Sequence, residues 1–235
     1  MAIYAISDLH LPFGIDKPMD VFGKAWENYT ERLFTNWNNT VKDNDTVIIP
    51  GDLSWATYLE ESYKDFDFIN KLNGRKIMSK GNHDYYFETM SKMNKFFKEN
   101  NFDTISILHN NYYNVENILV CGTRGWDVLG NSDEDKKLIS REAIRLELSI
   151  IKAKKDYPNL PVYAFLHYPP IHNQNNKENE IRQILGKYNV QKCFFGHLHA
   201  KGINNAFTGE YNNILYSLIS ADFLDFNPLP IHNSP

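Results

Sequence analysis

Short apolar runs recur along the chain and predict buried β-strands. Six such runs are dominated by aliphatic, aromatic and β-branched side chains and are bounded by polar or turn-forming residues. They occupy residues 2–7, 46–50, 75–79, 117–123, 161–167 and 191–196. Because these runs are apolar throughout and do not alternate with polar residues, they are typical of strands that are covered on both faces.

Amphipathic segments lie between several of these runs and predict helices. They span residues 25–41, 58–72, 88–99 and 134–155. In the last segment an apolar residue recurs every three or four positions while charged residues fill the rest, so we expect one face to pack on the core. That apolar stripe consists of Ile139, Ala143, Leu146, Ile150 and Ala153.

The order of these elements predicts the fold class. Strands that alternate with helices indicate an α/β fold with parallel strands. Residues 202–220 differ, because they read as two strands joined by a turn that contains Gly and Asn, and they add antiparallel pairing. A mixed sheet system is therefore predicted. No repeat, low-complexity block or linker divides the chain, so residues 1–235 are predicted to form a single domain.

The composition narrows the class of protein. With 42% hydrophobic and 23% charged residues, the chain is predicted to be an ordinary globular protein. Its formal net charge is -4, and no run of Lys or Arg exceeds two residues. A dedicated nucleic-acid binder usually carries a basic patch, so nucleic acid is not favoured as a partner, although a local patch could still serve a nuclease.

The apolar runs also bear on the location of the protein. None reaches the length that spans a membrane, and no secretory signal peptide is apparent, so we expect no membrane association and a cytoplasmic location. Cys121 and Cys193 each lie within an apolar run. We therefore predict two buried thiols in preference to a disulfide.

Polar side chains that can bind metals follow five of the predicted strands. In chain order they are Asp8 and His10; Asp52; Asn82, His83 and Asp84; His167; His197 and His199. Each group alone has a simpler explanation, because Gly-Asp is common in turns and an Asn-His-Asp segment could cap a helix. The carboxyl ends of parallel strands meet at one edge of a sheet, where α/β proteins bind ligands. Coincidence at five strand ends therefore favours a common site.

The chemistry of these side chains indicates metal ions. His197 and His199 lie two residues apart, so in an extended chain both rings point the same way; two unrelated surface histidines are the simpler alternative. The predicted ligands combine oxygen and nitrogen donors without sulfur: Asp8, His10, Asp52, Asn82, His167, His197 and His199. One catalytic tetrahedral ion usually takes three protein ligands. The larger set suits two ions that share a carboxylate.

Taken together, these groups resemble the signature of the calcineurin-like metallophosphoesterase superfamily. That signature is D-x-H, G-D, G-N-H-[DE], H and G-H-x-H, and every part is present in this order between residues 8 and 199. Asp84 stands where many members have Glu. The resemblance implies an α/β fold in which two mixed β-sheets pack as a sandwich flanked by helices.

The resemblance also implies a role for each residue. Asp8, His10 and His199 would hold one metal ion, while Asn82, His167 and His197 would hold the other. Asp52 would bridge the two ions. His83 would face the substrate as a general acid or phosphate-orienting group, and Asp84 would steady its ring, which makes both catalytic residues. Asn82 and His83 would also contact the substrate.

The implied activity is that of a metal-dependent phosphohydrolase. Two divalent ions, Mn, Fe or Zn by the donor set, would generate a bridging hydroxide that attacks phosphorus. Small phosphodiesters are the expected substrates, because the net charge disfavours long nucleic acids. The alternatives are a phosphomonoesterase or protein phosphatase, a nuclease, and a non-catalytic metal-binding scaffold. The physiological substrate, the metal pair and the oligomeric state stay open.

Three residues outside the signature complete the predictions. Arg124 follows the strand at 117–123 in a glycine-containing loop and is predicted to bind the substrate phosphate, with a solvent-facing Arg as the alternative. Trp55 is predicted to pack on the next helix, with a place in the wall of the pocket as the alternative. Asp222 is predicted to lie on the surface.

Overall fold

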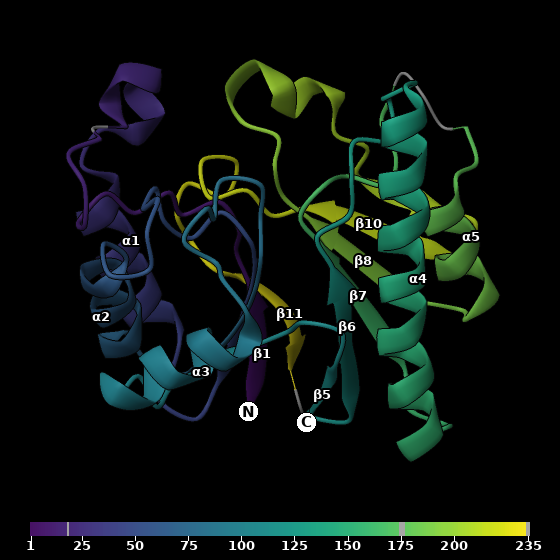
Figure 1. Cartoon of the computed structure of the whole chain (residues 1–235), viewed down its shortest axis with the longest axis horizontal. Coiled ribbons are helices and arrows are strands. Elements are labelled where there is room, and N and C mark those ends of the chain that lie inside the picture. Colours follow the sequence, from purple (N-terminus) through teal and green to yellow (C-terminus); the bar gives the residue numbers. More distant parts are fainter. Residues whose placement is uncertain (18, 174–176, 234–235) are drawn as a thin grey trace.

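The structure, a computed structural model, describes residues 1–17, 19–173 and 177–233. Two β-sheets stack face to face, and helices cover the outer face of each sheet (Figure 1). Both sheets contain parallel and antiparallel pairs. The fold is therefore the α/β sandwich of two mixed sheets that the family resemblance implies.

The first sheet has five strands in the order β11-β1-β2-β3-β4. The strands β1 to β4 run parallel to one another, and β11 pairs antiparallel with β1. They span Ala2–Ala5 (β1), Thr46–Pro50 (β2), Arg75–Ser79 (β3), Ile105–Ile107 (β4) and Leu229–Asn233 (β11).

The second sheet has six strands in the order β5-β6-β7-β8-β10-β9. Its four central strands are parallel, while β5 and β9 pair antiparallel at the two edges. They span Tyr112–Val115 (β5), Ile118–Thr123 (β6), Val162–Leu166 (β7), Lys192–Phe195 (β8), Gly209–Tyr211 (β9) and Ile214–Leu218 (β10).

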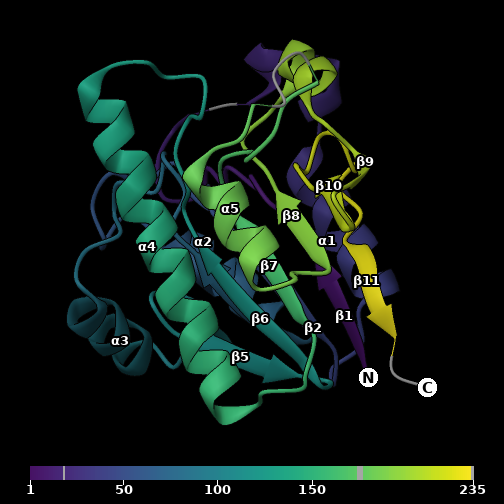
Figure 2. The same cartoon turned by 90° about the vertical axis from the view of Figure 1, so that its right-hand side faces the viewer.

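Helices α1, α2 and α3 pack on the outer face of the first sheet, and α4 and α5 cover the second (Figure 2). They span Tyr29–Thr40 (α1), Tyr63–Lys71 (α2), Met90–Glu99 (α3), Asp133–Asp156 (α4) and Glu180–Lys187 (α5). Short 3₁₀ turns occupy Asp20–Phe22, Lys24–Trp26 and Ala200–Asn205. The molecule thus has four layers, with one apolar core between the sheets and one beneath each layer of helices.

The layering explains why the predicted strands are apolar throughout. In β7, Tyr163 and Phe165 belong to the core between the sheets, whereas Ala164 and Leu166 face the helices. Successive side chains of a strand point to opposite faces, so a strand with two covered faces needs an unbroken apolar run. All six predicted runs form strands in this way, as β1, β2, β3, β6, β7 and β8.

Helix α4 follows its sequence signals closely. Ser132 forms a capping box with Asp135, acidic residues occupy the first turn and basic residues the last. The predicted stripe from Ile139 to Ala153 is buried against the second sheet. The hairpin predicted at 202–220 is also present, because β9 pairs antiparallel with β10.

Other boundaries differ from the prediction. Helix α1 begins at Tyr29 and not at residue 25, because Lys24–Trp26 form a 3₁₀ turn and Asn28 takes a left-handed backbone conformation with φ 50°. Helix α2 begins at Tyr63, after a turn at residues 58–62. The patterns gave no expectation of β4, β5, β11 or α5. Pro230 lies within β11, and it is tolerated there because β11 is an edge strand.

Cys121 and Cys193 are buried free thiols on the face of the second sheet that packs against α4 and α5, as the sequence predicts. Within the described ranges, none of the helices is both long and apolar enough to cross a membrane.

Candidate metal centre

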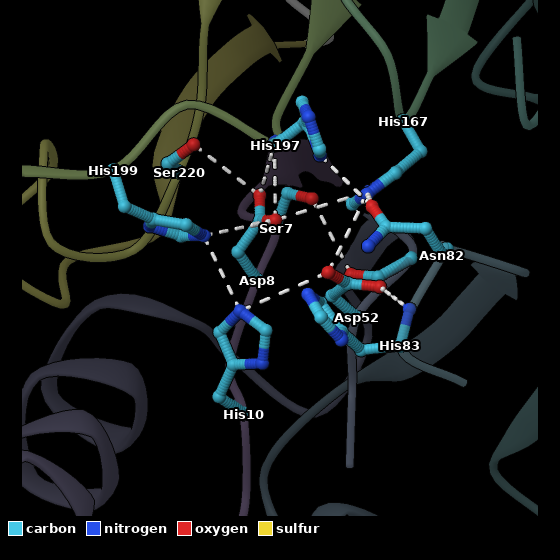
Figure 3. A network of polar contacts seen from close by, with 12 residues as sticks. Ser7, Asp8, His10, Asp52, Asn82, His83, His167, His197, His199 and Ser220 are labelled. Carbon is cyan, nitrogen blue, oxygen red and sulfur yellow. Dashed lines mark hydrogen bonds and ion pairs between the residues drawn. The ribbon is translucent and has the colours of Figure 1, made fainter. Parts of the chain in front are cut away.

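The carboxyl ends of β1, β2, β3, β7 and β8 meet at one edge of the sandwich, and their loops bring the predicted ligands together (Figure 3). Strands β1 to β3 belong to the first sheet, whereas β7 and β8 belong to the second. The cluster therefore forms where the two sheets meet. Two groups within it have ligand atoms close enough to share one metal ion: Asp8, His10 and His199; Asp8, Asp52 and His167.

Asp8 is fully buried within the cluster, as is His167. Its two carboxylate oxygens accept the backbone N–H of His197 at 3.0 and 2.9 Å. The Ser220 hydroxyl donates to Oδ2 at 3.3 Å, and the His199 Nε2 lies 3.2 Å from Oδ1. Asp8 thereby joins the loop after β1 to the loop after β8.

Asp52 lies between the imidazoles of the two sheets. Its Oδ2 is 3.4 Å from Nε2 of His167 and 3.8 Å from Nε2 of His10. Its Oδ1 accepts the backbone N–H of His83 at 2.8 Å, which fixes the direction of the carboxylate. Of the two groups whose ligand atoms are close enough to share one ion, Asp52 belongs to one and Asp8 to both.

Asn82 and the two remaining histidines lie beside this pair. The Asn82 Oδ1 is 2.6 Å from Nε2 of His167 and 2.8 Å from Nδ1 of His197. On the other side of Asp52, Nε2 of His10 and Nε2 of His199 approach to 3.3 Å. Seven oxygen and nitrogen donors thus converge from five loops. This donor set fits divalent metal ions, because ring nitrogens and carboxylate oxygens point inward from all sides.

The backbone at these loops is unusual. Asp8, His10, Asp52 and His197 all have positive φ, at 61°, 46°, 51° and 70°. Such left-handed conformations are uncommon for residues other than glycine and cost free energy, so they persist only where surrounding contacts enforce them. Here they turn each loop sharply after its strand, and several side chains thereby reach one point.

Two glycines of the signature are needed because other atoms occupy the space of a side chain. A Cβ on Gly81 would lie 2.1 Å from Oδ1 of Asp52, and a Cβ on Gly196 would lie 2.1 Å from Oδ2 of Asp8. Both distances are far shorter than any van der Waals contact. The carboxylates therefore pack directly against glycine backbone.

Burial sets the protonation of most of the histidines. It lowers the pKa of His10 and His197, and it lowers that of His167 to about 3, so these rings are neutral near pH 7 with a lone pair for a metal. Burial also lowers the pKa of His199, but the carboxylates of Asp8 and Asp222 outweigh it and raise that pKa to about 10. Burial, Asp84 and Asp8 together raise the pKa of Asp52.

His83 stands at the edge of the cluster and is half-buried. Its ring lies 4.6 Å from that of Trp55 and 5.6 Å from that of His10, measured between centroids. Burial and the nearby Lys17 ammonium lower its pKa, so its ring is neutral near pH 7. It can therefore face a ligand that binds at the cluster.

Asp84 has a different role from the one predicted. Its buried carboxylate accepts the backbone N–H groups of Gly81 and Asp52 at 2.7 and 2.8 Å, and those of Leu53 and Ser54 at 2.9 and 3.4 Å. The prediction that it steadies the His83 ring is replaced, because both oxygens serve main-chain donors. Asp84 ties the loop after β2 to the loop after β3 and so positions Asp52.

Arg124 lies beside the cluster, at the end of β6. Its backbone carbonyl accepts the N–H of His167 at 3.0 Å and of Tyr168 at 2.9 Å. Its guanidinium carbon lies 4.9 Å from the centroid of Trp126, and the side chain lines a pocket shared with α4. The side chain thus borders a neighbouring pocket, and within the described residues it makes no ion pair with a carboxylate of the cluster.

Three residues have site contacts that the sequence analysis did not assign. Asp222 is not a surface residue, since its carboxylate is 2.9 Å from Nδ1 of His199 and only 2% exposed. Trp55 does not simply pack on the next helix, because its ring stacks on His10 at 4.4 Å. Lys17 lies 3.2 Å above the Trp55 ring. Asp222 follows β10, so the rule of polar residues after strands would have found it.

The sequence also matches known proteins. The sequence model of the calcineurin-like phosphoesterase family matches residues 1–201. An uncharacterized protein of Methanocaldococcus jannaschii, MJ1445, is 34% identical over 89 residues, which are 37% of this chain and 48% of that protein. The chain thus spans about half the length of this curated relative.

Solved structures share the fold. AQ665 from Aquifex aeolicus, a protein of unknown function, has a TM-score of 0.53 at 16% identity and covers 97% of this chain and 95% of its own. TT1561 of Thermus thermophilus has a TM-score of 0.56 at 13% identity, with coverage of 84% and 81%. Phosphopantetheinyl hydrolase from Mycobacterium tuberculosis has a TM-score of 0.53 at 13% identity, and the match covers 100% of this chain and 96% of that protein. At these identities the likeness is one of fold alone.

Proposed function

The chain belongs to the calcineurin-like phosphoesterase family, and from that premise we propose that it hydrolyses small phosphodiesters with two divalent metal ions. The observation that carries the proposal is the convergence of two buried carboxylates, four imidazoles and one amide at a single point between the sheets. A buried polar cluster of this kind is costly without a ligand. Divalent ions would satisfy these donors.

We propose one ligand group for each ion. Asp8, His10 and His199 would hold the first, Asn82, His167 and His197 the second, and Asp52 would contact both. The ions, with Mn, Fe and Zn all suited to these donors, would lower the pKa of bound water and offset charge on the phosphoryl oxygens. Asp84 would act through Asp52 as a positioning residue, because its contacts are with the loop backbone.

His83 and Asn82 are the groups of this chain that we expect the substrate to meet. With its lowered pKa, the His83 ring is neutral near pH 7 and can donate one N–H to a phosphoryl oxygen. That favours the orienting role over the general-acid role, which requires a protonated ring. Lys17 lies on the same side and would add positive charge next to the phosphate.

Aromatic walls support a diester over a monoester. Trp55 stacks on His10 on one side of the cluster, and Tyr168 lies 4.2 Å from His197 on the other. A diester carries an organic group on each side of its phosphorus, so both walls can be used, whereas a monoester needs only one. Aromatic rings are suited to such apolar groups.

The test is hydrolysis by metal-stripped protein to which Mn, Fe, Ni or Zn is returned. We expect metal to restore turnover of a chromogenic phosphodiester well above that of the matching monoester. A monoester preference would replace the proposal with a phosphatase. No turnover of either compound by protein that binds two ions would contradict the diesterase activity.

A further inference from the structure

A pocket of about 240 Å³ is lined in part by residues next to loops of the metal centre. It is lined by the ends of β3 and β6 and by α4, and it includes Lys80, Arg124, Arg141 and Arg145. Lys80 directly precedes the Gly81-Asn82 segment, and the carbonyl of Arg124 accepts the N–H of His167. Both residues therefore connect the pocket to loops of the cluster.

The pocket is rich in cations, and its carboxylates are already engaged. Glu142 is fully buried and accepts hydrogen bonds from Arg145 at 2.8 Å, from Arg141 at 3.1 Å and from the Thr123 hydroxyl. The other carboxylate of the pocket, Glu88, forms an ion pair with Lys92, and both side chains are exposed to solvent. The acidic groups of the pocket thus neutralise only part of its positive charge.

Lys80 and Arg124 are the cations left over. Neither makes an ion pair with a carboxylate in the part of the chain that the structure describes. Among the residues that the structure describes, the Lys80 ammonium donates only to the carbonyl of Phe87, at 3.3 Å. The Nε of Arg124 is buried and has no hydrogen-bond partner among the described residues. Partly desolvated donors without acceptors are costly, and an oxyanion in the pocket would satisfy them.

We propose that this pocket binds a second anionic group of the substrate, a phosphate carried on one alcohol of the scissile diester. The inference rests on the proposed diesterase function. A cavity of about 240 Å³ is smaller than the usual site for a whole small molecule, so it suits one end of a ligand whose scissile phosphate lies at the cluster.

A phosphate matches the pocket better than a carboxylate does. Each guanidinium has five N–H donors, of which Arg141 and Arg145 use only some on Glu142, and a phosphate has enough terminal oxygens to accept from several of the others at once. A dianion also offsets more of the positive charge than a monoanion. The substrate class is therefore a short phosphodiester in which one of the two alcohols carries a second, terminal phosphate.

Binding can be measured apart from turnover. Inorganic phosphate is titrated by calorimetry into the protein with its metals and again after chelation. We expect one phosphate site to survive chelation and to weaken about tenfold in Arg124→Gln, because a charge-assisted hydrogen bond is lost. Arg145→Gln should weaken it similarly, and its melting temperature shows whether the loss of a Glu142 partner disturbs the fold. Lys137→Gln is the matched control, since it removes an exposed cation of α4 outside this pocket.

Turnover then tests the link to the metal centre. Two p-nitrophenyl alkyl phosphodiesters are compared that differ only in whether the alkyl group ends in a hydroxyl or a phosphate. We expect a lower KM for the phosphate-bearing compound. In Arg124→Gln the ratio of the two KM values should shrink about tenfold.

The outcomes separate the two proposals. Phosphate binding that disappears with the metals, or that is unchanged in both arginine variants, overturns the pocket. Equal KM values for the two diesters in the wild-type protein overturn its role in substrate choice. Phosphate binding in the chelated protein without hydrolysis of either diester supports the anion site and refutes the diesterase activity.

Discussion

The two sheets contribute to the candidate metal centre in different ways. The loops of the first sheet supply its carboxylates, and these are held by main-chain groups. Asp52 accepts a backbone N–H, Asp84 accepts four, and Gly81 leaves room for a carboxylate to pack on the main chain. The positions of these carboxylates are therefore fixed by the backbone of the loops.

The loops of the second sheet supply three of the four imidazoles, and these are held by individual side-chain and carbonyl atoms. The Nδ1 of His167 is 3.2 Å from the Pro50 carbonyl oxygen, and the Nδ1 of His199 contacts Asp222. His199 is also partly exposed, whereas Asp8 and Asp52 are buried. We therefore expect a substitution at the carboxylates of the first sheet to disturb the whole centre. A substitution beside one imidazole of the second sheet should disturb mainly that ring.

The largest effect is expected at the carboxylate between the sheets. Asp52→Asn keeps the shape of the side chain but removes a charge that we propose both ions share. Activity should fall by about 10²–10³-fold, as when one electrostatic group is removed from an active site, with little loss of fold. Steady-state kinetics and a melting curve measure the two effects. Asp67→Asn, at an exposed ion pair with Lys71, is the matched control. Wild-type turnover by Asp52→Asn would contradict the assignment.

The contact between the sheets should be the next most sensitive point. Gly196→Ala puts a methyl group 2.1 Å from Oδ2 of Asp8 and 2.4 Å from the Ser7 hydroxyl. Overpacking of this kind typically costs about 1–3 kcal/mol in the free energy of unfolding, which denaturant titration measures. At Gly186, in α5, an added Cβ meets no atom within 4 Å. Gly186→Ala should therefore stabilise by about 0.5–1 kcal/mol. Equal stability of the two alanine variants would show that Gly196 is not tightly packed.

A smaller effect is expected where a carboxylate outside the predicted ligand set orients a single imidazole. Asp222→Ala removes the carboxylate that orients His199 and should weaken metal affinity about 10–100-fold, with partial recovery in Asp222→Asn. Metal titration by calorimetry is the measurement, since a purely structural residue would change the melting temperature without this graded recovery. Asp225→Ala is the control, because Asp225 is exposed and pairs with Arg32. Equal metal affinity in both alanine variants would remove Asp222 from the site.

The smallest effect concerns stability behind the first sheet. Burial raises the pKa of Asp65, on α2, to about 6, although Ser54 and the Phe13 N–H donate to its carboxylate. The folded protein holds this proton more tightly than the unfolded chain, so wild-type stability should fall as pH rises from about 4 to about 6 and then level off. Asp65→Asn cannot ionise and should lack this fall.

Denaturant titration at pH 4 and pH 7 tests the point. The difference in unfolding free energy between Asp65→Asn and wild type should grow by roughly 2 kcal/mol over that interval. Turnover should change little, because Asp65 contacts the loop after β2 only through Ser54. A stability difference that is independent of pH would contradict the raised pKa.

The sequence predicted the parts of this protein that follow from local pattern. Strands with two covered faces need unbroken apolar runs, so β2 and β7 could be predicted from their apolar runs alone. Polar residues after such strands lie at one edge of an α/β sheet, which is why Asp8 and His197, distant in sequence, could be expected together.

Features that depend on distant backbone were not predictable in this way. The role of Asp84 is set by N–H groups up to 32 residues away, and nothing in the Asn-His-Asp segment specifies them. The pairing of Asp222 with His199 depends on β10 lying beside β8 in the sheet. Strand β11 contains a proline and is stable only because β1 offers it an edge.

The pairing of β1 with β11 also sets an order of events in time. Ala2 lies opposite Asn233, so β1 and its outer neighbour β11 are separated by almost the whole length of the chain. Contacts between such distant segments form slowly, because the entropy cost of closing a long loop comes before the contacts can stabilise the chain. Asp222, which orients His199, lies just before that late strand. We therefore expect the contact between Asp222 and His199, and with it full affinity for metal, to form late in folding.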